Sequence, residues 1–298
     1  MPARLILNAD DFGLTPGINR AVAELHTAGV LTSATLMANG PAFQDAIAIA
    51  HALPTLRIGA HIVLTDGAPV SDPARIPTLL GPDRHTLRPT LTGFLAALLL
   101  RRIREDEIER EALAQIRKIQ NAGIPLTHID THKHTHIVPA VLRPLLRAAA
   151  RAGVPTLRYP FEPRWSAAIS RPATPLLRRL QLRALRVFEP TFRTLAPPAT
   201  DGTLGIAATG HLNPTTLRAI LHAIPQHGAF ELCCHPGYHD DALSHLPTRL
   251  RAHRDIEREA LLTVIPERMQ HPNPPRLIHY ESPEESPDDS PAPSEHPL

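Results

Sequence analysis

Two adjacent carboxylates near the start of the sequence are the first residues whose type and spacing suggest chemistry. Asp10 and Asp11 closely follow the apolar run 5–7. Such a run, followed by polar residues, is typical of a buried strand that ends at the edge of a sheet. Neighbouring carboxylates repel each other unless a cation or a hydrogen-bond network compensates their charge. The pair therefore suggests a metal site, although a simple turn leading into Gly13 would also explain the pattern.

Histidines also stand at predicted strand ends. His61 lies in an apolar strand pattern, His235 follows the apolar run 230–234, and residues 128–136 read HIDTHKHTH. Alternate residues of an extended strand share one face. We therefore predict that one face carries a ladder formed by His128, Asp130, His132, His134 and His136.

Each of these features has a simpler interpretation when taken alone. His61 would suit a buried core, His235 a turn, and the ladder a surface that traps metal ions. Taken together, a carboxylate and imidazoles at several strand ends are typical of a catalytic centre with one divalent metal ion. We favour this joint interpretation, with the identity of the metal left open between magnesium, zinc, iron and nickel.

Alternating strand and helix patterns must position these residues. Besides the segments above, strand patterns fall at 33–38, 155–159, 202–207 and 276–280, and helix patterns at 15–26, 41–53, 94–104, 105–121, 139–152, 176–188 and 249–264. About seven strands that alternate with helices predict an α/β fold with parallel strands, a distorted or incomplete (β/α) TIM-like barrel. In such a barrel the active site lies at the C-terminal strand ends.

The domain organisation follows from the same patterns. We expect a single barrel domain over 1–280, with insertions near 66–104 and 160–200. The first insertion leaves the sheet at the edge that carries His61, where loops of this length shape binding sites. Residues 281–298 are acidic and rich in Pro and Ser, which predicts a disordered tail.

Composition indicates a soluble globular protein. Hydrophobic residues make up 43% of the 298 residues, charged residues 20%, and the net charge is +2. No apolar run approaches the ~20 residues of a spanning helix. No leader pattern precedes the first strand, so a cytoplasmic location is expected. Cys233 and Cys234 would point to opposite faces of a strand, and we expect both to be reduced.

Five short motifs together resemble the YdjC-like carbohydrate deacetylase family, which includes the chito-oligosaccharide deacetylases. They are NADDFGL at 8–14, TSAT at 32–35 with NG at 39–40, GAHIVLT at 59–65, HIDTHKHTH at 128–136, and CHPG at 234–237. The match runs in order from residue 4 to about 280. The resemblance implies a distorted (β/α) barrel and metal-dependent removal of an N-acetyl group from an amino sugar.

The resemblance also implies roles for individual residues. Asp11, His61 and His132 match the metal ligands, Asp10 matches the general base, and His235 stands where an active-site acid is expected. Positions expected around them, as supports of these residues or as contacts to substrate, are Asp130, His128, His134, His136 and Tyr238. Lys133 departs from relatives that carry a histidine there.

A finer resemblance is to the branch associated with hopanoid lipid biosynthesis, through RYPFEP at 158–163 and CHPGY at 234–238. A glycosylated hopanoid intermediate is then the expected substrate. Between 141 and 200 there are eleven arginines and only two acidic residues. Arg179, Arg183 and Arg186 would oppose an apolar stripe, a pattern typical of a helix on an anionic membrane surface. Peripheral contact with the inner face of the membrane is therefore expected, against the alternative of an ordinary surface helix.

Other functions remain open at this stage. A soluble chito-oligosaccharide deacetylase is the nearest alternative, and a metal-dependent phosphoester hydrolase would require basic residues at the same rim. A non-catalytic metal-binding or carbohydrate-binding protein would need no free base, which Asp10 beside Asp11 argues against. No nucleic-acid-binding pattern accompanies the arginines. A homodimer is compatible with the sequence.

Overall fold

The computed structural model describes residues 2–172, 174–246 and 248–280. The predicted tail over 281–298 lies outside the described residues.

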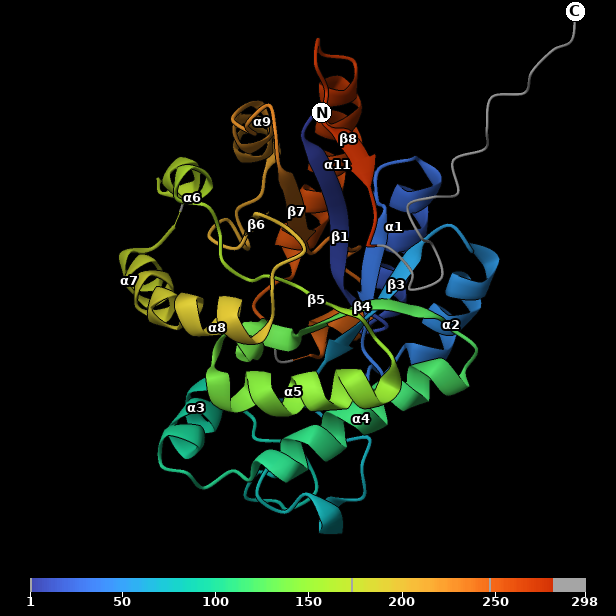
Figure 1. Ribbon diagram of the computed structural model, residues 1–298. Helices are drawn as coiled ribbons and strands as arrows, with labels where there is room; N and C mark the ends of the chain where they lie inside the picture. The colour runs from blue at the N-terminus through green and yellow to red at the C-terminus, as the bar shows by residue number, and fades with distance from the viewer. Residues whose placement is uncertain (1, 173, 247, 281–298) are drawn as a thin grey trace, which may run out of the picture.

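One curled sheet of eight parallel strands forms the centre of the protein (Figure 1). Along the chain the strands are β1 (Arg4–Phe12), β2 (Ser33–Leu36), β3 (Arg57–Ile62), β4 (Leu126–Thr131), β5 (Thr156–Leu157), β6 (Gly202–Leu204), β7 (Ala229–Cys234) and β8 (Arg276–Ile278). Their order is β5-β4-β3-β2-β1-β7-β6, and β8 pairs with β1. Strand β1 is central, because it pairs with β7 on one side and with β8 and then β2 on the other.

The barrel is incomplete between β5 and β6, which lie at the two ends of the strand order. Residues 158–163, which follow β5, bridge this opening. Thr203 on β6 donates its backbone N–H to the carbonyl oxygen of Phe161 at 3.3 Å, and its hydroxyl to that of Tyr159 at 2.7 Å. The structure thus confirms the predicted incomplete parallel barrel.

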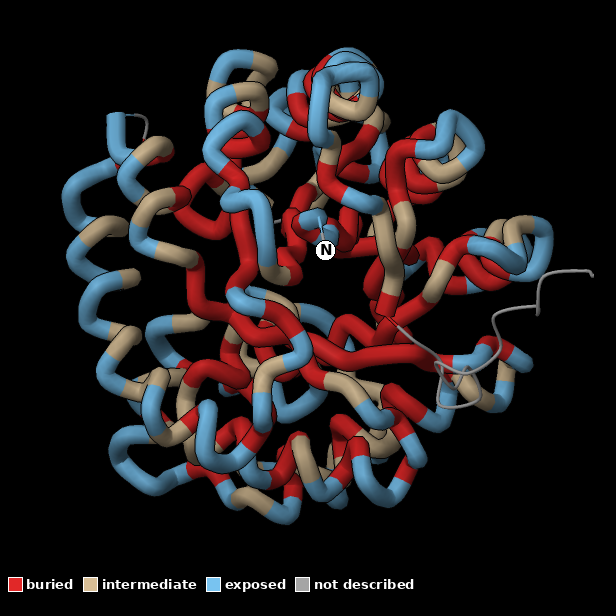
Figure 2. Tube along the Cα trace, turned by 45° about the horizontal axis from the view of Figure 1, so that its top comes forward, coloured by how far each residue is buried: buried red, intermediate tan, exposed pale blue. Residues whose placement is uncertain are grey.

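Helices surround the sheet (Figure 2). Those between and after the strands are α1 (Pro16–Thr27), α2 (Phe43–Ala52), α3 (Leu91–Leu99), α4 (Glu105–Asn121), α5 (Pro139–Ala152), α6 (Arg164–Ser170), α7 (Leu176–Leu185), α8 (Glu189–Leu195), α9 (Pro214–His222), α10 (Asp241–Ser244) and α11 (Ala252–Met269), with short 3₁₀ turns at η1 (Pro73–Arg75), η2 (His132–Ile137) and η3 (Arg186–Phe188). In the described parts of the chain, none of these helices combines the length and the hydropathy needed to cross a bilayer.

Helix starts follow local sequence signals. Thr15 caps α1 by accepting the backbone N–H of Ile18 at 3.2 Å, and Pro16 occupies the first helical position, where its missing N–H costs nothing. Asn213 caps α9 in the same way. Buried residues of α1, α4, α5 and α9 then join one hydrophobic cluster with the strands.

Two expectations about the helices were wrong. Helix α3 begins at Leu91 and ends at Leu99 rather than spanning 94–104, and Arg101 beyond it has a positive φ of 54°. Three helices, α6 to α8, occupy 161–199, where one was expected. These segments are short and partly exposed, so packing rather than periodicity sets their bounds.

The histidine ladder is also wrong beyond Thr131. Strand β4 ends there, and the following residues form η2, in which Lys133 and His134 have positive φ values of 58° and 52°. Two successive left-handed residues turn the chain away from the extended path. The alternation therefore holds for His128 and Asp130 but not for the three later histidines.

Polar residues fill the inside of the curled sheet, and one glycine makes room for them. Gly59 on β3 is paired with His128 on β4. A Cβ atom at Gly59 would lie 2.5 Å from Cε1 of His128, closer than such atoms can approach. The glycine is therefore required for the imidazole to lie inside the barrel.

Candidate active site

Asp11, His61 and His132 converge at the carboxyl edge of the sheet. Oδ1 of Asp11 lies 3.4 Å from Nε2 of His61 and 3.2 Å from Nδ1 of His132, and the two nitrogens are 3.3 Å apart. Asp11 and His61 are buried, whereas the His132 side chain is 21% exposed. The three groups thus form a small cluster that opens to solvent at His132.

Each of the three side chains is directed by the local backbone. Asp11 has a positive φ of 65°, which is uncommon for a residue with a side chain. This conformation separates its carboxylate from that of Asp10. His61 lies next to the last residue of β3, and His132 follows β4 directly. Because β3 and β4 are adjacent and parallel, the two imidazoles meet at one edge.

The cluster fits a divalent metal ion. Donor atoms that share one zinc ion at about 2.0–2.2 Å lie about 3–3.6 Å apart, as the three atoms here do. Oδ1 of Asp11 is buried without a hydrogen-bond partner among the described residues, a costly arrangement unless a ligand occupies it. Nδ1 of His61 lies 2.7 Å from Oδ1 of Asp130, which orients the ring and leaves Nε2 for the metal.

The charges around the cluster support the same assignment. Four carboxyl groups and two guanidinium groups contact one another or the cluster: Asp10, Asp11, Asp130 and Glu231, with Arg158 and Arg254. When all are ionised they leave two negative charges, which one divalent cation balances. Burial alone would lower the pKa of His61, but Asp130 and Asp11 outweigh it and raise that pKa to about 10. A proton and a metal ion therefore compete for this ring.

Asp10 is held separately, by Arg158. The guanidinium binds both carboxylate oxygens, with Nη2 2.7 Å from Oδ1 and Nη1 2.8 Å from Oδ2. Asn8 and Thr35 also donate to Oδ1, at 3.0 and 3.2 Å. Burial opposes the ionised form, but Arg158 and the nearby His61 outweigh it and hold the pKa of Asp10 well below its usual range. Asp10 is thus a fixed carboxylate beside the metal cluster.

Arg158 is the centre of this buried network. It also contacts Asp130, and its Nε lies 2.8 Å from Oε1 of Glu231. The side chain is fully buried, which is tolerable only because each end of the guanidinium meets a carboxylate. Tyr280, after β8, donates its hydroxyl to Glu231 at 2.6 Å.

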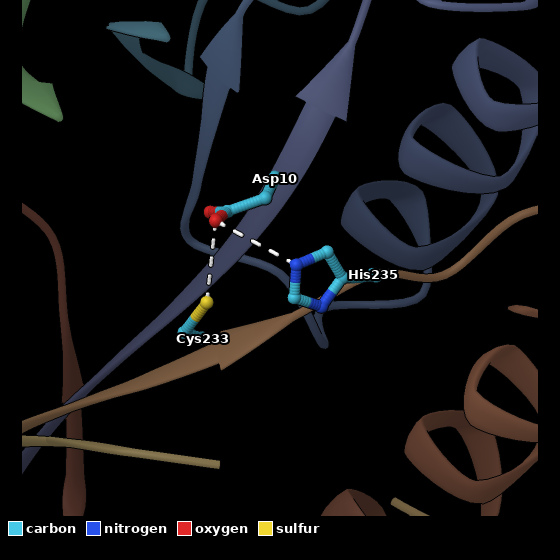
Figure 3. Close-up of side chains that lie close together, drawn as sticks. All are labelled: Asp10, Cys233 and His235. Atoms are coloured by element: carbon cyan, nitrogen blue, oxygen red, sulfur yellow. Dashed lines mark hydrogen bonds and ion pairs between the residues drawn. The ribbon is translucent and has the colours of Figure 1, made fainter. Parts of the chain in front are cut away.

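His235 and Cys233 both lie against the carboxylate of Asp10 (Figure 3). Its Nε2 is 3.8 Å from Oδ2 of Asp10, and the thiol of Cys233 donates to the same oxygen at 3.3 Å. Both cysteines at the end of β7 are free and buried, as expected. Burial lowers the pKa of His235 to about 4, although Asp10 and Asp11 act in the opposite direction. The ring is therefore neutral at neutral pH.

Helix α11 fixes both Asp11 and His235. Nη2 of Arg254 binds Oδ2 of Asp11 at 2.5 Å, and its Nη1 lies 3.4 Å from the carbonyl oxygen of His235. One turn later, Glu257 accepts the backbone N–H of His235 at 2.6 Å. Burial raises the pKa of Glu257 to about 8, against the opposing effects of that N–H and of Arg254.

The remaining predicted site residues have different surroundings. His128 lies deeper in the barrel, where Nε2 meets Asn8 at 3.2 Å and the ring stacks on Tyr280. Nδ1 of His136 lies 2.7 Å from the hydroxyl of Thr131. Nδ1 of His134 is buried without a hydrogen-bond partner among the described residues, and a role for this ring in substrate binding stays a prediction.

Tyr238 makes its side-chain contacts with two helices. Its ring is stacked between the guanidinium groups of Arg20 on α1 and Arg258 on α11, and its hydroxyl donates to Glu24 at 2.9 Å. These contacts link α1 to α11. A role for Tyr238 in substrate binding stays a prediction.

The sequence analysis did not identify the two buried arginines as part of the site. Arg158 stood at the end of the predicted strand 155–159, so the strand-end criterion that selected the histidines could have selected it too. Arg254 lies within a charged helix pattern that gave no sign of burial. Its contact with Asp11 joins residues 243 positions apart.

Fold and site together define an incomplete (β/α)-barrel protein with a candidate metal centre at the carboxyl ends of its strands. The chain belongs to the family of YdjC-like proteins, which it matches over residues 4–266.

Curated relatives carry the name carbohydrate deacetylase. One from Brevibacillus brevis is 42% identical over 158 residues, which cover 53% of this chain and 60% of the relative. One from Thermoanaerobacter pseudethanolicus is 29% identical over 86% of this chain and 90% of the relative. The matches to the first curated relatives, such as that from Brevibacillus brevis, span about 60% of those relatives' length.

A solved structure supports the fold. A proposed cellobiose-phosphate cleavage protein from Enterococcus faecalis aligns over 94% of this chain and 98% of its own, with a TM-score of 0.73 and 24% identity. At this identity the likeness extends to the fold alone.

Proposed function

We propose that this protein hydrolyses the N-acetyl group of an N-acetylated amino sugar in a metal-dependent reaction. The observation that carries the proposal is the convergence of Asp11, His61 and His132 beside a separate carboxylate, Asp10, that Arg158 holds in place. Membership of a family whose curated relatives are named carbohydrate deacetylases supports the same reaction.

Asp11, His61 and His132 would hold the metal ion. When bound, the divalent cation would polarise the acetyl carbonyl and make a water molecule more acidic. Asp130 keeps His61 oriented, and Arg254 keeps Asp11 oriented.

Asp10 acts as the general base. Its low pKa keeps it ionised, and Oδ2 accepts a proton from the water that adds to the acetyl carbon. Arg158 prevents rotation of the carboxylate, so this oxygen stays near Nε2 of His235.

His235 returns the proton to the leaving group. Because burial lowers its pKa to about 4, the ring is neutral at the start and must take up a proton before it can act as the expected acid. Nε2 lies 3.8 Å from Oδ2 of Asp10, so a small movement passes the proton from Asp10 to His235 and on to the nitrogen. The C–N bond then breaks, and acetate and a free amine are formed.

For the substrate, we propose an amino sugar linked to a lipid, a glycosylated hopanoid intermediate, as the motifs at 158–163 and 234–238 imply. Phosphate ester hydrolysis is less well supported, because the guanidinium groups of Arg158 and Arg254 are already bound by carboxylates. Lys133 at the rim is likewise paired with Asp66.

Acetate release tests the proposal. Purified protein loaded with zinc or magnesium is incubated with a soluble chito-oligosaccharide and with an N-acetylglucosaminyl lipid. We expect Asp10→Asn to keep its metal and to lose about 10²–10⁴-fold in turnover, the usual contribution of a general base. Asp241→Asn, a change at an exposed residue of α10, is the matched control. No acetate from either substrate would refute the proposal, and loss of metal from Asp10→Asn would make Asp10 a ligand.

A further inference from the structure

Helix α7 presents its apolar side to solvent. Leu176, Leu177 and Leu180 are 65%, 67% and 55% exposed, and Val187 in η3 is 71% exposed. No residue of α7 is buried. In Figure 2, α7 is the helix at the left edge, coloured pale blue and tan. Ala184 is also exposed and lies between Leu180 and Val187, so these five residues, which we call the α7 face, follow helical spacing.

Arginines hold the opposite side of α7 against the protein. Arg178 donates to the carbonyl oxygen of Ile206 at 2.9 Å, and Arg179 to that of Thr174 at 2.8 Å. Arg186 donates to the carbonyl oxygen of Glu162 at 2.7 Å. The protein side therefore carries arginines beside Leu185 and Phe188, which pack against the core, while the solvent side is apolar, a partial reversal of the usual surface helix.

This reversal corrects the sequence interpretation of the same segment. Arg179 and Arg186 do not face outward as a basic surface, because both are bound to backbone carbonyls. Arg183 remains exposed beside the α7 face. The outward surface is consequently apolar, with arginine at its border.

The arginine contacts also place α7 at the rim of the candidate active site. Glu162 and Ile206 follow the carboxyl ends of β5 and β6, where the sheet is open. Arg158, between β5 and Glu162, is the residue that binds Asp10. Helix α7 is thus fastened to the two loops that border the open side of the barrel.

We propose that the α7 face docks on an anionic lipid bilayer. Exposed apolar clusters of this kind mark interaction surfaces. The sequence of 176–188 has four arginines and no acidic residue. Arg183 is exposed beside the face, and the uncharged carbonyl oxygens that bind Arg178 and Arg179 leave their positive charge in place, which complements anionic headgroups. A second copy of the chain is a poorer occupant, since stable dimers bury about 800 Å² and 20–30 residues on each partner. Docking would present a lipid-linked substrate to the open side of the barrel, and only this use of docking rests on the proposed function.

Co-sedimentation with vesicles tests the docking. The full-length chain is mixed with vesicles of equal parts phosphatidylglycerol and phosphatidylcholine, and with phosphatidylcholine alone. We expect the variant Leu177→Ser/Leu180→Ser/Val187→Ser to lose at least about tenfold in binding to the anionic vesicles, since affinity scales with inserted apolar area. Leu99→Ser/Leu100→Ser, at the exposed last residue of α3 and the exposed residue that follows it, is the matched control and should still bind.

Several outcomes would overturn the proposal. The proposal is wrong if the unmodified chain does not bind the vesicles, or if the α3 control loses as much binding as the triple variant. It is also wrong if high salt abolishes binding completely, or if analytical ultracentrifugation shows a dimer that the triple variant abolishes. Circular dichroism and acetate release from the soluble substrate should be unchanged in the triple variant. Failure of docking with acetate release intact would leave the proposed function standing, whereas vesicle binding without any acetate release would refute that function alone.

Discussion

The interior of the barrel and helix α7 place polar and apolar residues in opposite ways. Inside the barrel, Arg158 and three carboxyl groups are almost completely buried, and each carboxyl group contacts the guanidinium. On α7, Leu176, Leu177 and Leu180 are more than half exposed, while arginines of the same segment bind backbone carbonyls of the protein. Neither region follows the rule that apolar residues lie inside and charged residues outside.

The two departures have different physical origins. A buried charge is tolerated when it is paired and hydrogen-bonded, and the barrel interior meets that condition. An exposed apolar face has no such compensation within the chain, so its explanation must lie in a contact outside it. Disturbing the buried charges of the barrel should therefore lower the free energy of unfolding strongly, whereas replacing the exposed leucines of α7 should hardly change it.

The largest effect is expected at the metal cluster. Asp11→Ala, His61→Ala and His132→Ala should each lose bound metal together with activity, by about a thousandfold or more, because two remaining ligands hold the ion too weakly. Metal analysis and acetate release measure this. His51→Ala, at an exposed histidine of α2, should change neither. Full metal content in one of the three variants would remove that residue from the ligand set.

Next in size is the loss of the central guanidinium. Arg158→Met leaves three carboxyl groups without their shared partner, and we expect unfolding in urea to require about 3–5 kcal/mol less free energy. Arg151→Met removes an exposed arginine paired with Glu109 and should cost less than about 1 kcal/mol. Similar losses in both variants would show that burial does not distinguish the two arginines.

The pH dependence of stability should reveal Glu257. Its pKa is raised to about 8 in the folded protein, so between about pH 4.5 and pH 8 the folded state binds a proton that the unfolded state has released. The contribution of Glu257 to stability should therefore fall by a few kcal/mol as the pH rises through this range, and level off above it. Glu257→Gln should weaken this fall in urea titrations at pH 5, 7 and 9. An unchanged pH profile would mean that another group is responsible.

The smallest effect is expected on α7. Leu177→Ala with Leu180→Ala should change the free energy of unfolding by less than about 0.5 kcal/mol, as surface substitutions do. By contrast, Leu217→Ala on α9, at a fully buried leucine, should cost about 2–5 kcal/mol. A comparable loss for the α7 pair would mean that its leucines pack against the protein, and the comparison between the two regions would fail.

The sequence alone was sufficient to predict the parallel barrel and the positions of Asp11, His61 and His132 at strand ends. Apolar runs define strands locally, and parallel strands bring their carboxyl ends to one edge, so residues placed there by pattern meet in space. The same reasoning correctly placed His128 and Asp130 on one face of a strand, because β4 is extended at those residues.

Tertiary structure alone decided the partners of these residues. Arg158 and Asp10 are 148 residues apart, and Arg254 and Asp11 are 243 apart. No local pattern records such pairings, because they depend on strand order and on how α11 packs against the barrel.

The tertiary structure also decided two orientations that the sequence pattern predicted wrongly: the path of the chain after β4, and the side of α7 that its arginines occupy. The left-handed turn at Lys133 and His134 ended the ladder, and contacts with the carbonyls of Glu162 and Ile206 turned the arginines of α7 inward. Helical spacing shows that one side of α7 is apolar, but only the available hydrogen-bond acceptors decide which side faces the solvent.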